Sequence, residues 1–307
     1  MTPPPLRSIV RATRRNPLVW RYLFNFTPTI TYHLERSSLV GETARVLSEL
    51  NRDGIAITTA KALLGDESCC RELATAVDRL EREQASTMEA MRAEANVDSA
   101  TGKKTFIFEL LNRNPVFDPD SIYARFALQQ PILQVANAYF GMLTRLRYYN
   151  VWHTFATDSQ PRESQLWHRD REDLLILKVF VYLSDVDEGA GPFTYARGTH
   201  PKGKQTQEAE SFMEGNVKRT TDDQMLNLIP KDRWRRGVGE SGTIIFADTR
   251  GYHKGGFART SDRLMYTCMF TSQASESEEF MLRLQQFAPP RDRARAFALN
   301  ASKQTSR

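Results

Sequence analysis

Cysteine is scarce in this sequence: there are three in 307 residues, with Cys69 and Cys70 adjacent and Cys268 far along the chain. An odd number without a Cys-x-x-Cys spacing argues against a disulfide framework and favours a reducing compartment. Long apolar runs are also lacking, since no stretch approaches the length of a membrane span. These absences predict a cytoplasmic protein without a transmembrane segment.

A strong excess of charge of either sign is missing as well. The 42 lysines and arginines outnumber the 37 acidic residues only slightly, and a net charge of +5 does not by itself imply a nucleic-acid partner. A small anionic substrate would suit this mild excess equally well. Hydrophobic residues make up 40% of the chain, which is enough for a substantial core. The length is within reach of one large β-barrel domain with helical additions.

Acidic residues are nearly absent from the first 36 positions, where Glu35 is the only one beside six arginines. An arginine-rich, acid-poor start can be a mitochondrial transit segment. The alternative, which we favour, is a basic arm over residues 1–40 that packs on the domain through large apolar side chains, namely Trp20, Tyr22, Leu23 and Phe24.

Helical patterns precede strand patterns along the chain. Apolar residues at helical spacing predict helices over residues 41–51, 66–94 and 120–142, the last interrupted at Pro131. Apolar or alternating segments predict strands over residues 55–58, 104–110, 146–155, 174–184, 192–195, 242–247 and 263–271. This order predicts a β-rich α+β fold, a jelly-roll barrel whose N-terminal helices pack on one sheet.

The barrel domain is expected to span residues 41–285. Within it, residues 202–236 form a polar connection that we expect to be mostly helical or irregular. Such a long connection inside a compact domain is often a lid or a wall of the substrate site. Residues 286–307 are expected to form a basic, polar tail, a helix that frays. Nothing in the sequence specifies an oligomeric state.

A histidine and an aspartate two positions apart, His168 and Asp170, point to the same side if their segment is an extended strand. A second histidine from a distant strand, His253, would complete a set of two histidines and one carboxylate, a usual way to hold iron(II) with open positions for oxygen chemistry. Chance alone could supply the His-x-Asp pattern. Its context favours a site, because His253 follows the end of one predicted strand and Arg263 begins the next. The planar guanidinium of an arginine is well suited to bind a carboxylate.

Four segments between residues 146 and 272 together form a pattern that resembles the phytanoyl-CoA dioxygenase family of iron(II)- and 2-oxoglutarate-dependent oxygenases. They are, in chain order, Gln165-Leu-Trp-His-Arg-Asp170, Leu177-Lys-Val-Phe-Val-Tyr-Leu-Ser-Asp185, Gly191-Pro-Phe-Thr-Tyr-Ala-Arg-Gly-Thr-His200, and Gly242-Thr-Ile-Ile-Phe-Ala-Asp248 with His253 and Arg263. The combined pattern is far more specific than any one of its pieces.

The resemblance implies a double-stranded β-helix, a cupin-like jelly roll, with three iron ligands: His168, Asp170 and His253. It also implies that Arg263 binds the distal carboxylate of the cosubstrate 2-oxoglutarate, with Arg259 as the alternative. Gln165 and Lys178 are expected to contact the cosubstrate as well. Lys178 is the only charge in its predicted strand, and the sequence leaves open whether it points to solvent or reaches a buried anion.

An enzyme of this family would use O2 and 2-oxoglutarate, release succinate and CO2, and hydroxylate an aliphatic carbon of a small molecule. Related halogenases lack the carboxylate ligand, so the presence of Asp170 argues for hydroxylation, desaturation or ring chemistry. Substrate contacts are expected from residues 202–236 and 94–106, whose sequence does not identify the substrate. The alternative function is a non-catalytic or non-oxidative cupin-like protein that binds a metal or a small molecule.

The other histidines are expected to be structural. His153 lies in a predicted strand, where packing in the core or the pocket wall is favoured over a substrate contact. His200 is expected in a loop, His33 receives no role, and Trp167 is expected to pack beside the metal. Two further carboxylates could rival Asp170 but lack its spacing from His168, namely Glu172 and Asp173.

Overall fold

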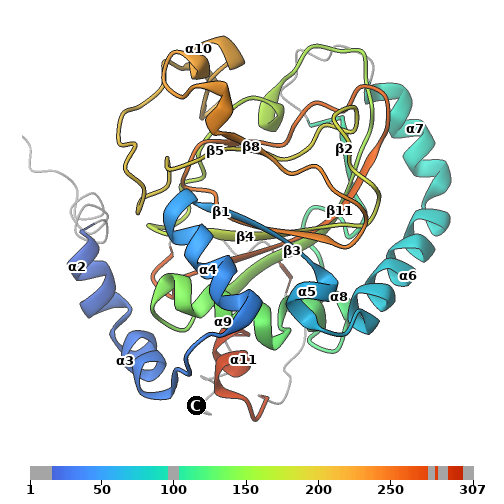
Figure 1. Cartoon of the computed structure of the whole chain (residues 1–307). Coiled ribbons are helices and arrows are strands. Elements are labelled where there is room, and N and C mark those ends of the chain that lie inside the picture. Colours follow the sequence, from blue (N-terminus) through green and yellow to red (C-terminus); the bar gives the residue numbers. More distant parts are fainter. Residues whose placement is uncertain (1–15, 96–103, 276–280, 283–289, 300–307) are drawn as a thin grey trace, which may run out of the picture.

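The computed structural model describes residues 16–95, 104–275, 281–282 and 290–299. It shows two antiparallel sheets packed as a jelly-roll sandwich, with helices on the outer face of the larger one (Figure 1). This confirms the predicted double-stranded β-helix with N-terminal helices on one sheet. The major sheet has six strands in the order β1 (Ile55–Thr59), β9 (Thr243–Asp248), β4 (Leu177–Tyr182), β11 (Arg263–Thr271), β3 (Arg145–Thr154) and β2 (Ile107–Glu109).

The minor sheet is shorter and its strands are joined by single bridges to neighbouring segments. Its three strands are β10 (His253–Lys254), β5 (Thr194–Ala196) and β8 (Trp234–Arg236). An isolated antiparallel bridge pairs His168 with His253, and another pairs Val186 with Gly239. A separate hairpin is formed by β6 (Phe212–Glu214) and β7 (Val217–Arg219). The bridge to His168 extends the minor sheet beyond β10.

Helices cover the outer face of the major sheet. α4 contacts β1, β9 and α9, while α8 contacts β3 and α6. Among the described residues, none of the helices is both long and apolar enough to cross a membrane. Their bounds are α4 (Gly41–Asp53), α5 (Ala60–Leu64), α6 (Ser68–Glu83), α7 (Ala85–Ala95), α8 (Ile122–Ala127), α9 (Gln130–Phe140), α10 (Asp222–Leu226) and α11 (Arg293–Ala298), with short 3-10 turns at η2 (Glu163–Gln165) and η3 (Lys231–Arg233).

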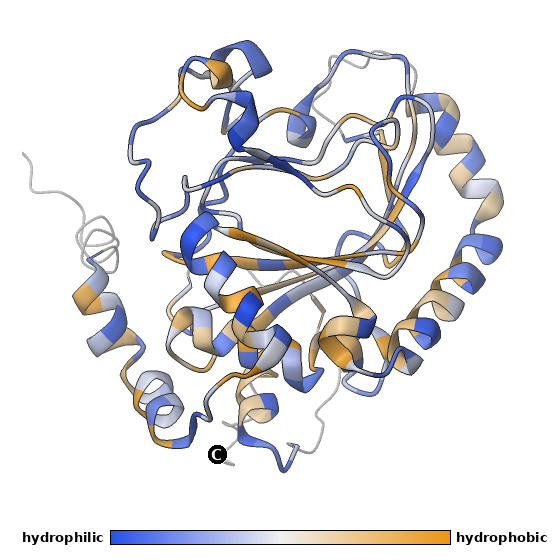
Figure 2. Ribbon diagram, viewed as in Figure 1, coloured by the Kyte–Doolittle hydropathy of each residue, from blue (hydrophilic) through white to orange (hydrophobic). Residues whose placement is uncertain are grey.

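The two faces of the major sheet bury different sets of side chains. In β4, Val179 and Val181 lie in the cluster under the helices, whereas Phe180 and Tyr182 lie in the cluster between the sheets. This alternation follows from the two-residue period of a strand. Figure 2 shows hydrophobic residues along these strands and on the helix faces beside them. Lys178 therefore belongs to the inner face, together with Phe180.

Two predicted helices are each divided in the structure. The helix expected over residues 66–94 breaks at Gln84, whose side chain donates to the carbonyl of Leu110 (3.0 Å). The helix expected over residues 120–142 stops at Ala127, and Pro131 lies in the first turn of α9. Proline is tolerated there because the first helical N–H groups have no intrahelical partner. The expectation of one unbroken helix over residues 66–94 was therefore wrong, whereas the interruption expected in the second helix is present but lies before Pro131, at residues 128–129.

The connection over residues 202–236 is mostly irregular or helical, as expected, but it also contains short strands that the sequence did not indicate. It contains the β6–β7 hairpin and α10, and its last three residues form β8, which pairs with β5 in the minor sheet. These strands have three residues each, which is too short to show a strand periodicity, and their exposed side chains are apolar in β6 and charged in β8. In the tail, α11 is the described helix.

The N-terminal arm is helical from residue 17 to residue 35. It consists of α2 (Pro17–Val19), the π-helix η1 (Trp20–Phe24) and α3 (Phe26–Glu35). Trp20 is buried, and its indole N–H donates to Asp173 Oδ1 (2.8 Å). The prediction that the arm packs on the domain is confirmed for Trp20 and wrong for Tyr22 and Leu23, which are exposed.

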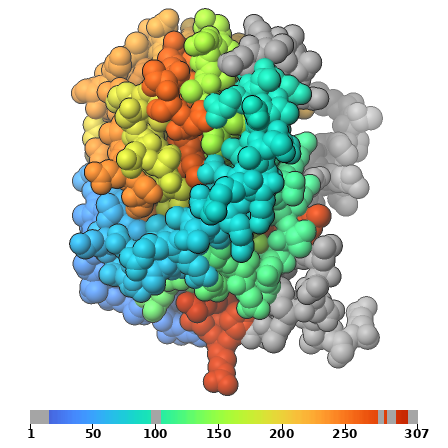
Figure 3. Space-filling model, turned by 90° about the vertical axis from the view of Figure 1, so that its right-hand side faces the viewer, coloured from blue at the N-terminus to red at the C-terminus, as the bar shows by residue number. Residues whose placement is uncertain are grey.

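His153 joins the α6–α7 helices to the sheet. Its Nδ1 lies 2.5 Å from Glu81 Oε1 in α6, and its Nε2 lies 2.7 Å from Asp262 Oδ2, just before β11. Asp262 also pairs with Arg92 of α7. Figure 3 looks onto this side, where the cyan α6–α7 pair lies across the sandwich. The expectation of a structural role for His153 matches these contacts.

The stability of the protein is expected to fall as the pH rises through the pKa of His153. Burial alone would lower that pKa, but hydrogen bonds to Asp262 and Glu81 outweigh burial and raise it above 6.5. The folded state therefore binds the proton more tightly than the unfolded state. The stabilisation is fully present below pH 6.5 and is lost as the pH passes the raised value. Thermal unfolding measured from about pH 5.5 to about pH 8.5 checks this expectation.

His153→Leu should remove most of this pH dependence and cost on the order of 2 kcal/mol at low pH, since hydrogen bonds to charged partners are lost. His33→Leu is the matched control, because His33 is exposed on α3. An unfolding midpoint of the His153→Leu protein that changes with pH as in the unmodified protein would contradict this assignment.

Candidate metal and carboxylate-binding site

His168 and His253 come from segments far apart in the chain that pair through their backbones. The N–H of His168 donates to the carbonyl of His253 (2.9 Å), and the N–H of His253 donates to that of His168 (3.0 Å). The two imidazole ring centroids lie 4.3 Å apart. The segment around His168 is extended but makes only isolated bridges, so the predicted strand is in fact a bridged loop.

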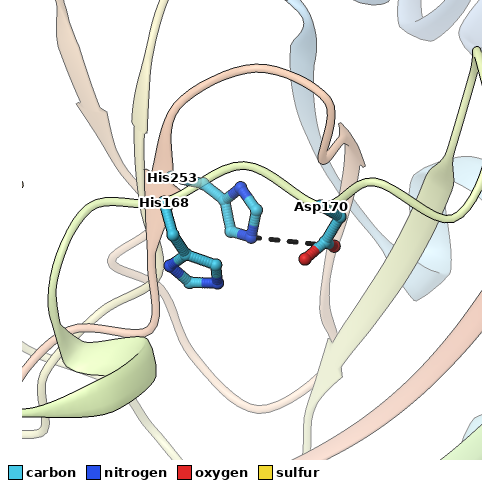
Figure 4. A group of neighbouring side chains, drawn as sticks. All are labelled: His168, Asp170 and His253. Carbon is cyan, nitrogen blue, oxygen red and sulfur yellow. Dashed lines mark ion pairs between the residues drawn. The ribbon is translucent and has the colours of Figure 1, made fainter. Parts of the chain in front are cut away.

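Asp170 reaches the same place from two residues further along. Its N–H donates to the carbonyl of Thr249 (2.9 Å), which continues the pairing between the two segments. Its Oδ2 lies 3.9 Å from His253 Nε2 (Figure 4). One ligand atom from each of His168, Asp170 and His253 lies within 4.8 Å of the others. The structure thus brings together the three residues expected to bind iron.

Backbone carbonyls orient both imidazoles. His168 Nδ1 lies 2.9 Å from the carbonyl of Leu166, and His253 Nδ1 lies 3.0 Å from that of Gly251. A carbonyl oxygen only accepts, so each Nδ1 carries the hydrogen and each Nε2 is left with a free lone pair. A second hydrogen bond of this kind is typical of histidines that bind metals.

The electrostatic environment keeps the three side chains in the protonation states that a metal ion requires. Burial lowers the pKa of His168 well below 6.5 and that of His253 to about 4, so both rings are neutral at neutral pH. Burial would raise the pKa of Asp170, but the charge of Lys178 outweighs burial and holds that pKa below its usual range. Neutral imidazoles and an ionised carboxylate are the forms that bind metals.

Lys178 points into the sandwich. Its Nζ lies 2.7 Å from Asp170 Oδ2, and its side chain is largely buried. Of the two orientations that the sequence left open, the structure shows the one towards a buried anion. Burial lowers the pKa of Lys178, but the carboxylate of Asp170 outweighs burial and the pKa is raised. A contact of Lys178 with the cosubstrate stays a prediction.

Arg263 is buried at the start of β11 with no carboxylate beside it. Its Nη1 donates to the carbonyl of Gly255, its Nη2 lies 3.5 Å from Thr154 Oγ1, and its Nε has no partner. Among the described residues, none of the ion pairs includes Arg263. Burial lowers the pKa of Arg263, which reflects the cost of an uncompensated charge. A carboxylate ligand would supply the missing partner.

One cavity of about 290 Å³ joins these groups. It is lined by the three metal-ligand candidates, Lys178 and Arg263, and by residues that the sequence reasoning did not single out as a pocket wall: Tyr148, Trp152, Phe180, Phe193, Met265 and Met269. Along β3, β4 and β11, several of these residues alternate with residues of the helix-side cluster. This alternation is the sequence feature from which the pocket wall could have been predicted. Lys104 and Phe106 also line the cavity, as expected for the segment over residues 94–106.

A second cavity, of about 740 Å³, lies next to the first and shares Gly256 with it. Gln165, Arg259 and part of the connection over residues 202–236 line this second cavity. Among the described residues, none from that connection lines the cavity with the metal-ligand candidates. Arg259 instead lies over the ring of Phe257. The geometry therefore separates Gln165 and Arg259 from the cluster formed by His168, Asp170 and His253.

The remaining candidates are accounted for by structural contacts. Trp167 is fully buried and donates to Asp222 Oδ1 (2.7 Å). Asp173 accepts from Trp20 and from the N–H of Ser272, while Glu172 lines the cavity beside Asp170. His200 lies outside the cluster.

The donor set fits iron(II). Two imidazoles and one carboxylate on one side of a metal leave open positions for other ligands, and this set is typical of non-haem iron(II) oxygenases. The uncompensated guanidinium in the same cavity fits a ligand that carries a carboxylate. A jelly roll that encloses such a set defines the class of cupin-like oxygenases.

The chain belongs to the phytanoyl-CoA dioxygenase (PhyH) family, whose family profile matches residues 50–265. The match confirms the family resemblance found in the sequence motifs. A search of curated protein sequences found no match.

Two solved structures of EctD share the fold at low sequence identity. EctD from S. alaskensis with bound Fe is 16% identical, with 82% of this chain and 86% of that chain covered and a TM-score of 0.53. EctD from S. alaskensis with 2-oxoglutarate and 5-hydroxyectoine is 15% identical, covering 80% and 83%, with a TM-score of 0.50. The epimerase SnoN in complex with Fe3+, alpha ketoglutarate and nogalamycin RO is 17% identical, covering 75% and 83%, with a TM-score of 0.49.

Proposed function

We propose that this protein is an Fe(II)- and 2-oxoglutarate-dependent oxygenase that hydroxylates an aliphatic carbon of a small molecule and releases succinate and CO2. The observation that carries the proposal is one shared cavity. It holds a candidate iron-binding set, His168, Asp170 and His253, and the uncompensated guanidinium of Arg263. Membership of the phytanoyl-CoA dioxygenase family supports the same chemistry.

Each residue has a separate role in this proposal. His168, Asp170 and His253 hold the metal, and Arg263 binds the distal carboxylate of 2-oxoglutarate. When bound, iron and 2-oxoglutarate supply an oxidant by reducing O2 while the cosubstrate loses CO2. We assign no cosubstrate contact to Gln165 or Arg259, because they line the other cavity.

The surrounding residues control charge and water. Lys178 holds Asp170 ionised before a metal binds, through the ion pair at 2.7 Å. Trp152, Met265 and Met269 form an apolar wall of the cavity, which excludes water from the reacting groups. The wall also supports a substrate with an apolar portion at the carbon to be hydroxylated. The carboxylate ligand leaves no place for a halide, which supports hydroxylation over halogenation.

Anaerobic addition of iron(II) and 2-oxoglutarate is expected to produce a visible charge-transfer band, because the proposed cavity would hold both groups together. Admission of O2 should bleach the band with formation of succinate. Spectroscopy under argon followed by succinate analysis measures both. A protein that binds iron but shows neither the band nor succinate would instead be a non-oxidative cupin-like binding protein.

The expected compartment, the cytoplasm, rests on the cysteines. Cys70 and Cys268 are buried and Cys69 is half-buried, and all three are free thiols. This supports a protein of a reducing compartment.

A further inference from the structure

Residues 248–251 form a turn at the end of β9, here called the ligand turn, which binds the backbone of Asp170 on both sides. The carbonyl of Thr249 accepts from the N–H of Asp170 (2.9 Å). The guanidinium of Arg250 donates to the carbonyl of Asp170 (3.0 Å). The position of this proposed iron ligand therefore depends on the position of the ligand turn.

The ligand turn also orients the ring of His253. The carbonyl of Gly251 lies 3.0 Å from His253 Nδ1, so a shift of this carbonyl would change the direction of the imidazole. Gly251 has no room for a side chain, since a Cβ there would lie 1.9 Å from the hydroxyl oxygen of Tyr195. Tyr195 is itself the partner of His253 in the pairing of β5 with β10. A second proposed ligand thus depends on the same turn.

Asp248 forms the ligand turn through both its side chain and its backbone. Its Oδ1 accepts from the N–H of Arg250 (3.0 Å), and its carbonyl accepts from the N–H of Gly251 (3.0 Å). The same carbonyl accepts from the hydroxyl of Tyr195 (2.7 Å). An aspartate that binds the backbone two residues further on stabilises a tight turn.

A tyrosine from the helical layer holds the other carboxylate oxygen. Tyr139 of α9 donates its hydroxyl to Asp248 Oδ2 (2.6 Å), and both side chains are buried. Burial raises the pKa of Asp248 to about 6, which reflects the cost of a carboxylate away from water. Packing alone would favour an apolar side chain here, whereas the two hydrogen bonds to its oxygens account for a carboxylate.

We propose that Asp248 is a positioning residue for the iron site. Its hydrogen bonds fix the ligand turn, and the turn fixes the backbone of Asp170 and the ring of His253. Asp248 acts through these ligands, because its own oxygens are held by Tyr139 and Arg250. The inference rests on the ligand assignment of the proposed function and extends it to a residue that orients the ligands.

The experiment titrates the full-length protein with cobalt(II) in place of iron(II), because the visible absorption of cobalt(II) reports both binding and the arrangement of its ligands. Asp248→Ala should lower the affinity for cobalt(II) by roughly 10–100-fold, as is typical when a partner that orients metal ligands is lost. The absorption of the bound metal should also change in shape. Asp248→Asn should retain most of the affinity, since its amide can accept from the N–H of Arg250 and donate to the oxygen of Tyr139.

A double variant separates positioning from stability. Asp248→Ala alone leaves the hydroxyl of Tyr139 buried without its acceptor, which should lower the unfolding temperature. Asp248→Ala/Tyr139→Phe removes both partners and should recover much of this stability. Its affinity for cobalt(II) should stay low, because the hydrogen bond to Arg250 is still missing.

The matched control is Asn137→Ala in the same helix as Tyr139. Asn137 is buried and its Oδ1 accepts from the N–H and from the hydroxyl of Thr144, each at 2.8 Å. The control therefore also removes a buried side chain that accepts two hydrogen bonds, but these do not involve the ligand turn. It should lower the unfolding temperature and leave the affinity for cobalt(II) unchanged.

Three results would overturn the proposal while leaving the ligand assignment intact. They are an unchanged affinity in Asp248→Ala, an affinity restored together with stability in the double variant, and an equal loss in Asp248→Asn, which would indicate that charge acts in place of hydrogen bonding. Absence of cobalt(II) binding by the unmodified protein, or full binding by Asp170→Ala, would instead show that the ligand assignment and this inference are both wrong.

Discussion

Asp170→Ala is expected to abolish iron binding and turnover while the jelly roll stays folded. The substitution removes the one carboxylate of the cluster that the structure describes around His168 and His253. Loss of a direct ligand should reduce metal affinity by more than the roughly 10–100-fold typical of an outer-shell partner. Anaerobic iron(II) titration and succinate production measure the two effects. Full turnover by the variant would refute the ligand assignment.

The same substitution leaves Lys178 without its partner, and this requires a control. Breaking a buried ion pair costs about 3–5 kcal/mol, because the remaining charge is uncompensated. The double variant Asp170→Ala/Lys178→Met should recover most of that stability and still fail to bind iron. Glu172→Gln is the matched control in the same cavity and should retain iron binding. Iron binding restored in the double variant would mean that Asp170 acts only on stability.

Arg263→Ala is expected to weaken 2-oxoglutarate binding by about 30-fold or more, since removing one partner of a buried hydrogen-bonded charge pair costs about 2–5 kcal/mol. Iron binding without the cosubstrate should be unchanged. Titration of the charge-transfer band with 2-oxoglutarate measures the affinity directly. Arg263→Lys should recover only part of it, because an ammonium lacks the planar pair of donors.

Arg259→Ala distinguishes the two arginines that follow His253. Arg259 lines the neighbouring cavity and stacks on Phe257, so its loss should leave the affinity for 2-oxoglutarate unchanged. If Arg259→Ala weakened binding while Arg263→Ala did not, the cosubstrate would occupy the other cavity.

Many of the barrel strands could be predicted from their apolar sequence pattern. Successive residues of these strands face the helices and the space between the sheets in turn. The predicted strands over residues 146–155 and 263–271 correspond closely to β3 and β11. The positions of the helix breaks could not be predicted from the periodicity of apolar residues. At the break, the side chain of Gln84 donates to the carbonyl of Leu110, a contact with a distant segment that periodicity does not reveal. β8 was missed because a three-residue strand has no periodicity to detect.

For the candidate site as well, some features could be predicted from the sequence and others could not. The types and order of His168, Asp170, His253 and Arg263 are local information, and they were sufficient to indicate iron chemistry and the family. The direction in which Lys178 points could not be predicted. Its strand is buried on both faces, so the sequence pattern does not show which face is exposed to solvent. Trp152 was missed for the same reason, since both faces of β3 carry aromatic residues.

By itself the sequence determined the jelly-roll class, the family and the residue types available to a metal. Only the tertiary structure decided that His168 and His253 face each other, that Lys178 meets Asp170, and that Arg263 rather than Arg259 shares their cavity. The physical reason is that strand periodicity encodes which side chains share a face. Which side chains meet across the cavity is decided by backbone pairing and burial between segments that are far apart in the chain.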